Sequence, residues 1–137
     1  MRGGKHTAEV RRWLDVADHD LAVVRLCLRL EPLLAEAAAY HCQQALEKIA
    51  KAYLVLVGVR FRKTHSIDEL VGYVERLDKS IADELTRLAW VTAWGVAHRY
   101  PYEEEPEPVP TWEEIEDVFA ATETLRIGLE ARLRHQG

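Results

Sequence analysis

The chain has 137 residues, of which 48% are hydrophobic and 30% are charged, a composition typical of one folded globular domain rather than of a disordered chain. No apolar run approaches the roughly 20 residues that span a bilayer, and the N-terminus carries no signal-peptide core, so we expect a cytoplasmic protein that does not enter a membrane. The net charge is −5, but eight of the 23 acidic residues fall within residues 102–117, which leaves 15 acidic against 18 basic residues elsewhere.

Two long helices are predicted first. Apolar residues recur at steps of three and four after Thr7, which is a suitable N-cap, until Pro32 ends the pattern. A second helix is predicted from about Leu33 to Val57. Gly58 then occupies the position after the helix end, where glycine is favoured.

A short helix and another long one follow. Ser66 and Glu69 match a capping box at the start of a helix that we expect to end near Leu77. The next helix is predicted to begin at Ser80 and to end at Pro101, because proline cannot continue a helix.

The C-terminal part begins with an acidic loop. Three prolines and four glutamates in residues 102–110 exclude a helix or a central strand there. Thr111 and Glu114 form a second capping box, which predicts a last helix, and no segment alternates long enough to predict a strand. We therefore predict an all-α fold, a single domain over residues 1–137 that forms an up-and-down antiparallel four-helix bundle with one additional short helix.

The second predicted helix separates its polar from its apolar residues almost completely. Its polar arc consists of His41, Gln43, Gln44, Glu47, Lys48 and Lys51. For any one of these residues we expect a solvated face, on which Glu47 and Lys51 form a favourable i, i+4 pair. As a set they are of more interest, because lysines can bind anions and glutamine amides can pair with a base edge.

Arg99 and Tyr100 are the first candidates for a ligand site. A guanidinium matches phosphate oxygens, and a phenol offers a ring for stacking; alternatively Arg99 binds the last helix carbonyls and Tyr100 packs into the core. His65 lies beside a basic run at 60–63, where its ring could bind a phosphate or hydrogen-bond locally in a solvated loop. His98 could act as an acid or base, but no nucleophile is evident.

Cysteine and histidine usage predicts neither a disulfide nor a metal site. Cys27 and Cys42 both fall on predicted helices, and we expect buried thiols in a reducing compartment. No residue spacing matches a metal-ligand pattern, and no cofactor is expected. The four tryptophans are predicted to lie in the core or in a dimer interface.

Three polar motifs occur in order along the chain: Gln-Gln-x-x-Glu-Lys-x-x-Lys-Ala at 43–52, Thr-His at 64–65 and Arg-Tyr-Pro at 99–101. In this order they resemble the HEPN domain family, over about residues 8–130. The resemblance implies an up-and-down helical bundle, often a homodimer, commonly encoded beside a minimal nucleotidyltransferase and proposed to bind nucleotides.

Several branches of that family are RNA-cleaving toxins that use an arginine and a downstream histidine with four to six residues between them. After Arg99 these positions hold Glu104, Glu105 and Pro106, so the motif is incomplete and an enzyme is not expected. Arg60 with His65 and Arg12 with His19 do match the spacing, but one or two such matches are about what chance gives in this chain.

We therefore expect a nucleotide-binding module that acts with a nucleotidyltransferase subunit, a combination that can belong to a toxin–antitoxin-type pair. The expected nucleotide-binding residues are Arg99, Tyr100, Lys48, Lys51, Gln44 and His65. One alternative is a metal-independent endoribonuclease toxin that uses Arg99, His98 and His65 on RNA. The other alternative is a purely structural dimeric scaffold.

Overall fold

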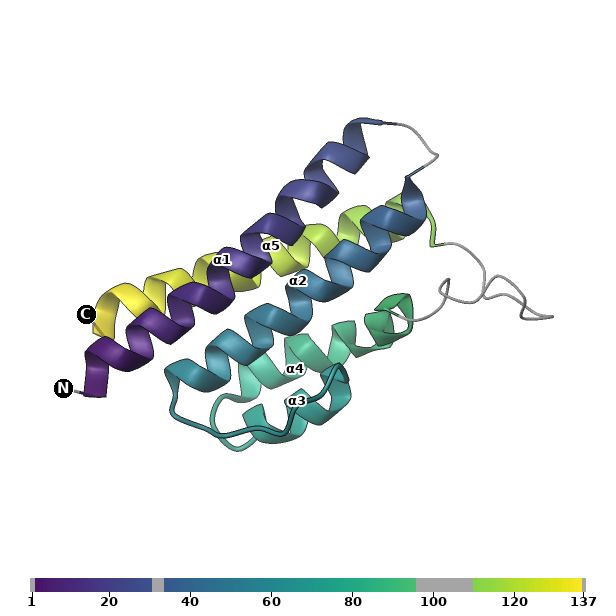
Figure 1. The fold of residues 1–137 in the computed structure, drawn as a ribbon. Helices are drawn as coiled ribbons and strands as arrows, with labels where there is room; N and C mark the ends of the chain where they lie inside the picture. The colour runs from purple at the N-terminus through teal and green to yellow at the C-terminus, as the bar shows by residue number, and fades with distance from the viewer. Residues whose placement is uncertain (1, 31–33, 96–109, 137) are drawn as a thin grey trace.

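A computed structural model of the protein describes residues 2–30, 34–95 and 110–136 (Figure 1). In these residues it contains five α-helices, one 3-10 helix and no strand, which confirms the predicted all-α class. The elements are α1 (Arg2–Arg29), α2 (Ala35–Leu56), α3 (Ile67–Val74), α4 (Lys79–Leu88), η1 (Ala89–Gly95) and α5 (Trp112–Gln136). None of the described helices combines the length and apolar character needed to cross a membrane.

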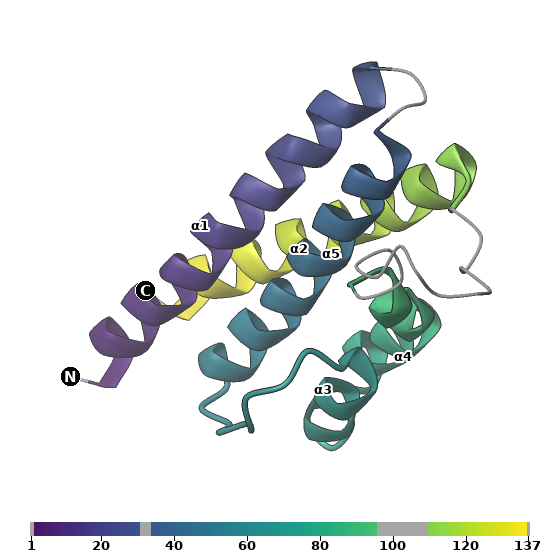
Figure 2. The ribbon, with the colours of Figure 1, turned by 45° about the vertical axis from the view of Figure 1, so that its right-hand side comes forward.

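The long elements alternate in direction, as in an up-and-down bundle. In Figure 1, α1 and α2 run antiparallel. Then α4 with η1 leads away from the end of the molecule where the chain begins, and α5 leads back to it, so both labelled chain ends lie at that end. Helix α2 is central, because it packs against α1, α5, α3 and η1. Figure 2 shows α3 beside α4, on the side of α2 away from α1, where it forms the additional short helix.

The core lies where the apolar stripes of these helices meet around α2. Among its fully buried side chains are Leu14, Leu21, Leu46, Leu54, Leu70, Leu85, Leu88 and Ile115. Cys27 and Cys42 are buried free thiols, as predicted. Burial raises the pKa of Cys42 to about 12, which is expected for a thiol in an apolar environment.

Three of the predicted helix ends are formed by the predicted residues. Gly58 has φ of +77° and donates its N–H to the Val55 carbonyl, while Val59 donates to Leu54, the paired bonds of a Schellman motif. The Ser66 hydroxyl accepts from the Glu69 N–H at the start of α3. At the start of α5, Thr111 and Glu114 each accept from the other's backbone N–H, which completes the predicted capping box.

The cap of helix α4 (Lys79–Leu88) lies two residues earlier than predicted, at Asp78 rather than at Ser80. The Asp78 carboxylate accepts hydrogen bonds from the Ile81 N–H at 3.1 Å and from the Ser80 hydroxyl at 2.9 Å, and it pairs with Arg132 of α5 at 2.7 Å. Partial burial raises the pKa of Asp78, but these hydrogen bonds outweigh it and lower the pKa to about 2.

Helix α4 does not remain α-helical as far as predicted. It changes to 3-10 geometry at Ala89, and Thr92 within η1 accepts a hydrogen bond from the Ile67 N–H at 3.2 Å. This bond satisfies one of the free donors at the start of α3. The predicted helix end at Pro101 and the acidic loop up to residue 109 lie outside the described residues.

Ion pairs join α1 to α5. Arg126 donates two hydrogen bonds to Asp18, at 3.0 and 2.9 Å, and Arg11 donates to Glu130 at 2.7 Å. The hydrogen bond to Asp18 raises the pKa of Arg126, and the bond from Arg11 lowers that of Glu130. These guanidiniums face carboxylates of their own chain, so they are poor candidates for binding an anionic ligand.

Candidate functional site

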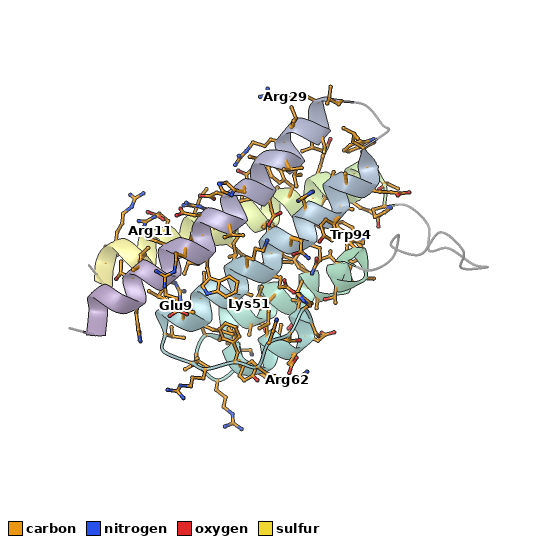
Figure 3. All side chains as sticks on the ribbon, viewed as in Figure 1. Glu9, Arg11, Arg29, Lys51, Arg62 and Trp94 are labelled. Atoms are coloured by element: carbon orange, nitrogen blue, oxygen red, sulfur yellow. The ribbon has the colours of Figure 1, made fainter. Side chains whose placement is uncertain are left out.

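The polar arc of α2 is largely buried rather than solvated. Gln43 is 1% exposed, Glu47 2% and Lys51 6%, so the expectation of a solvated Glu47–Lys51 pair was wrong. The cause is tertiary: Trp13 of α1 covers Lys51, whose Nζ lies 5.5 Å from the ring centroid, and Phe61 packs against Trp13. Figure 3 shows Lys51 on α2, between α1 and the chain that leads into α3.

Asp20 of α1 supplies a buried carboxylate to this face. Its Oδ1 lies 2.8 Å from His41 Nδ1, and its Oδ2 accepts a hydrogen bond from Lys48 Nζ at 2.6 Å. One carboxylate thus holds two α2 side chains that are seven residues apart. Asp20 was not predicted from the sequence, although it lies three residues after Ala17 and four before Val24, which places a charge on an apolar stripe and could have revealed it.

Glu47 forms a second carboxylate–histidine pair, with the residue that precedes α3. The Glu47 Oε1 lies 2.8 Å from His65 Nδ1, and its Oε2 lies 3.9 Å from Lys51 Nζ. Because a carboxylate only accepts, Nδ1 carries the proton of a neutral His65 ring, and Nε2 keeps a free lone pair. The His65 side chain is 75% exposed, so this nitrogen is open to a ligand.

The backbone around His65 is fixed by its neighbours in sequence. Thr64 is buried, and its hydroxyl accepts a hydrogen bond from the Ser66 N–H at 3.1 Å, while Ser66 caps α3. These bonds hold the turn in one conformation. The predicted Thr-His motif therefore has a structural half, Thr64, and an outward-facing half, His65.

The two glutamines are joined side chain to side chain. Gln44 Nε2 donates to Gln43 Oε1 at 2.7 Å, and Gln43 is buried whereas Gln44 is half-buried. Donating through Nε2 leaves the Gln44 carbonyl as an acceptor near the surface. Gln44 is thus the glutamine that a ligand can reach.

We call these residues the polar cluster: Asp20, His41, Gln43, Gln44, Glu47, Lys48, Lys51 and His65. When both histidines are neutral, the two carboxylates balance the two ammonium groups and the polar cluster has no net charge. A protonated histidine gives the polar cluster a net positive charge. Arg60 and Lys63 are exposed in the segment that precedes His65. Arg62 of the same segment pairs with Glu69 at 2.8 Å.

The structure brings together four of the six residues predicted to bind a nucleotide, Gln44, Lys48, Lys51 and His65. The other two, Arg99 and Tyr100, lie outside the described residues, and so does His98. Within the described residues, no group of three or more histidine, cysteine, aspartate or glutamate side chains could hold a metal ion.

A protein-family model described as the HEPN domain matches residues 10–127 of this chain. The matched span begins in α1, ends in α5 and contains every residue of the polar cluster. No curated protein and no solved structure matches the chain.

Proposed function

Because the chain belongs to the HEPN family, we propose that it is a nucleotide-binding helical module that acts with a nucleotidyltransferase subunit. We place the nucleotide on the polar cluster. The observation that carries this proposal is the burial of charged side chains on α2, at positions where a helix bundle needs only apolar ones. Buried ion pairs seldom add net stability, and titratable groups in such settings are often functional.

Each accessible group of the polar cluster has a role in the proposed site. His65 Nε2 accepts a hydrogen bond from a base when neutral and donates to a phosphate when protonated. The Gln44 amide pairs with a base edge. Lys48 has two Nζ hydrogens beyond the one it donates to Asp20, and these can reach a phosphate.

The remaining groups act indirectly or extend the site. Lys51 is covered by Trp13, so it balances the charge of Glu47 instead of contacting the ligand. In the proposal Arg99 binds phosphate and Tyr100 stacks on the base, as the chemistry of these side chains suggests. Arg60 and Lys63 add positive potential that attracts an anionic ligand.

Isothermal titration calorimetry with ATP and AMP tests nucleotide binding. We expect the wild-type protein to bind nucleotide. The His65→Ala and Arg99→Ala variants should bind at least about tenfold more weakly, because each loses one charge-assisted hydrogen bond to the ligand. His135→Ala, which removes an exposed histidine of α5, serves as the control with unchanged affinity. No heat with the wild-type protein, or equal affinities in all variants, would contradict the proposal.

The proposed partner is tested by identifying the protein that the neighbouring reading frame encodes. A small nucleotidyltransferase that is encoded there and co-elutes with this chain in gel filtration supports the proposed pairing. An unrelated antitoxin in that position instead favours RNA cleavage by this chain. If the two proteins still co-elute when residues of the polar cluster are substituted, and no nucleotide binds, the structural scaffold is the better explanation.

The Glu47–His65 pair favours one second candidate, a metal-independent endoribonuclease, because a histidine oriented by a carboxylate is a suitable general base. In that case the purified protein cuts RNA in the presence of EDTA, and His65→Ala and Arg99→Ala abolish the cutting. Intact RNA after prolonged incubation with the wild-type protein argues against this candidate.

A further inference from the structure

A cavity lies between α2, α4 and α5, on the face of α2 opposite to the polar cluster, and we call it the α4–α5 cavity. Its volume is about 110 Å³. Ile49, at its floor, is two residues from both Glu47 and Lys51 along α2, and two helical steps turn the chain by about 200°. Its apolar lining consists of Ile49, Ala50, Ile81, Leu85, Leu125 and Leu129.

The cavity reaches the surface at Gly128 of α5. Helix α4 packs mainly against α3 and η1, and α5 packs against α2 and α1, so the two helices leave a gap between them above α2. Outside its own helix, no described atom lies within 4 Å of the place where a side-chain carbon at position 128 would stand. Its φ is not positive, so neither crowding nor backbone conformation requires a glycine, which destabilises a helix relative to alanine. What Gly128 provides is an opening into the cavity.

One end of the cavity is polar, because Tyr53 and Arg132 line it. Tyr53 is 4% exposed, and its hydroxyl accepts a long hydrogen bond from Arg132 Nη1 at 3.4 Å. Burial raises the pKa of Tyr53, so the phenol keeps its proton. No group in the described residues accepts that proton, although a buried hydroxyl is expected to have an acceptor. An acceptor that enters the cavity would complete this hydrogen bond.

The charge at the polar end is already balanced. Arg132 pairs with Asp78 at 2.7 Å, and its guanidinium carbon lies 5.4 Å from the centroid of the Tyr53 ring. The guanidinium keeps further N–H groups as donors. A carbonyl oxygen, which has two lone pairs, suits this pair of donors. A carboxylate would lose its water beside the Asp78 carboxylate without gaining an unpaired cation.

We propose that the α4–α5 cavity binds a small uncharged molecule that consists of one ring, or a short branched chain, with a carbonyl group. The apolar part lies among the leucines, and the carbonyl oxygen accepts hydrogen bonds from Tyr53 and Arg132. The size follows from the volume, because a closed apolar cavity of about 150 Å³ binds benzene and this one, at about 110 Å³, is open at Gly128. The site is separate from the polar cluster and does not depend on nucleotide binding.

Backbone-amide NMR titrations with acetophenone, ethylbenzene and benzoate test the ligand class, because the three probes share a ring and differ in the group attached to it. We expect acetophenone to shift the amides of Leu85 and Gly128. Benzoate should bind at least about tenfold more weakly, because its charge must be desolvated beside Asp78. No shift of these amides with acetophenone at its solubility limit, or benzoate binding as tight as acetophenone binding, would overturn the proposal.

Two variants test the position of the ligand. Gly128→Leu, which places an apolar side chain in the opening, should abolish acetophenone binding, whereas the matched control Gly72→Leu, in open space on α3, should leave it unchanged. Tyr53→Phe removes only the hydroxyl and should weaken acetophenone binding about fivefold while leaving ethylbenzene binding unchanged. Acetophenone binding that Gly128→Leu does not reduce, or that Tyr53→Phe weakens no more than it weakens ethylbenzene binding, would overturn the proposal. His65→Ala, in the polar cluster, should not affect either probe.

Discussion

Replacing Glu47 alone is expected to destabilise the protein more than replacing Glu47 and Lys51 together. Glu47 is 2% exposed, and its carboxylate lies 3.9 Å from the Lys51 ammonium, which is itself covered by Trp13. Glu47→Leu therefore leaves a buried ammonium without its carboxylate. Removing one member of a buried pair costs about 3–5 kcal/mol, and we expect about 3 kcal/mol because the pair is not in close contact.

The double variant Glu47→Leu/Lys51→Met removes both buried charges and puts two apolar side chains in their place. Replacing a whole buried pair by apolar residues is often neutral, so we expect the double variant to lose no more than about 1 kcal/mol. The thermodynamic cycle then gives a coupling of at least about 2 kcal/mol between the two residues. In thermal unfolding, Glu47→Leu should lower Tm by about 10 °C.

Urea unfolding followed by circular dichroism measures these differences, with all variants at one protein concentration. The matched control is the exposed pair Glu84–Arg87 on α4, at 2.5 Å, for which we expect a coupling below about 0.5 kcal/mol. If Glu47→Leu costs less than about 1 kcal/mol, or if the two single effects add up in the double variant, water screens this pair and our account of the buried charges is refuted.

Three further outcomes are expected. Gly58→Ala should lower the unfolding free energy by about 1 kcal/mol or more, because residue 58 has a positive φ. Gly72→Ala, in open space on α3, should leave the unfolding free energy unchanged or raise it by up to about 1 kcal/mol. Equal effects of the two substitutions in urea unfolding would contradict this. Asp78→Ala should lower the unfolding free energy by about 2–3 kcal/mol at pH 7, because the pKa of Asp78 is about 2 in the folded state against about 3.9 unfolded and each pKa unit corresponds to about 1.4 kcal/mol. The difference from wild type should persist above pH 4 and shrink toward pH 2, as urea unfolding at each pH would show; a constant difference would argue against the cap. Cys42, whose buried thiol has a pKa of about 12, should not react with a thiol reagent at pH 8 unless the protein is unfolded. A cysteine placed at the exposed Ser80 should react at once and serves as the control. Rapid labelling of Cys42 in the native protein would show that the core opens.

The helix ends were predictable because their causes are local. Gly58, Ser66 and Thr111 each act through atoms within a few residues of themselves, so the sequence contains the whole interaction. Asp78 and Ser80 are both suitable caps and stand two residues apart. Asp78 is the cap in the structure, and it also binds Arg132 far along the chain, a contact that the local pattern does not reveal.

The burial of the polar cluster could not be predicted, because periodicity assigns residues to a face without showing what covers that face. The polar arc of α2 was identified correctly, and only its environment was wrong. Trp13 and Asp20 of α1 cover or bind that arc, and both lie more than 20 residues before it. The change to 3-10 geometry at Ala89 has the same origin, since the contact of Thr92 with Ile67 is tertiary.

Two of the three motifs on which the family resemblance depends are joined by a hydrogen bond in the structure, and the third, at residues 99–101, lies outside the described residues. Glu47 comes from the first motif and His65 from the second, and the 2.8 Å contact between them explains why the two motifs occur together. Lys48 of the first motif donates a separate hydrogen bond to Asp20 of α1, which lies outside both motifs. A substitution at any one of these residues therefore alters the charge that its partners meet, so the residues of the polar cluster should be tested in pairs, each acid with the base that it holds.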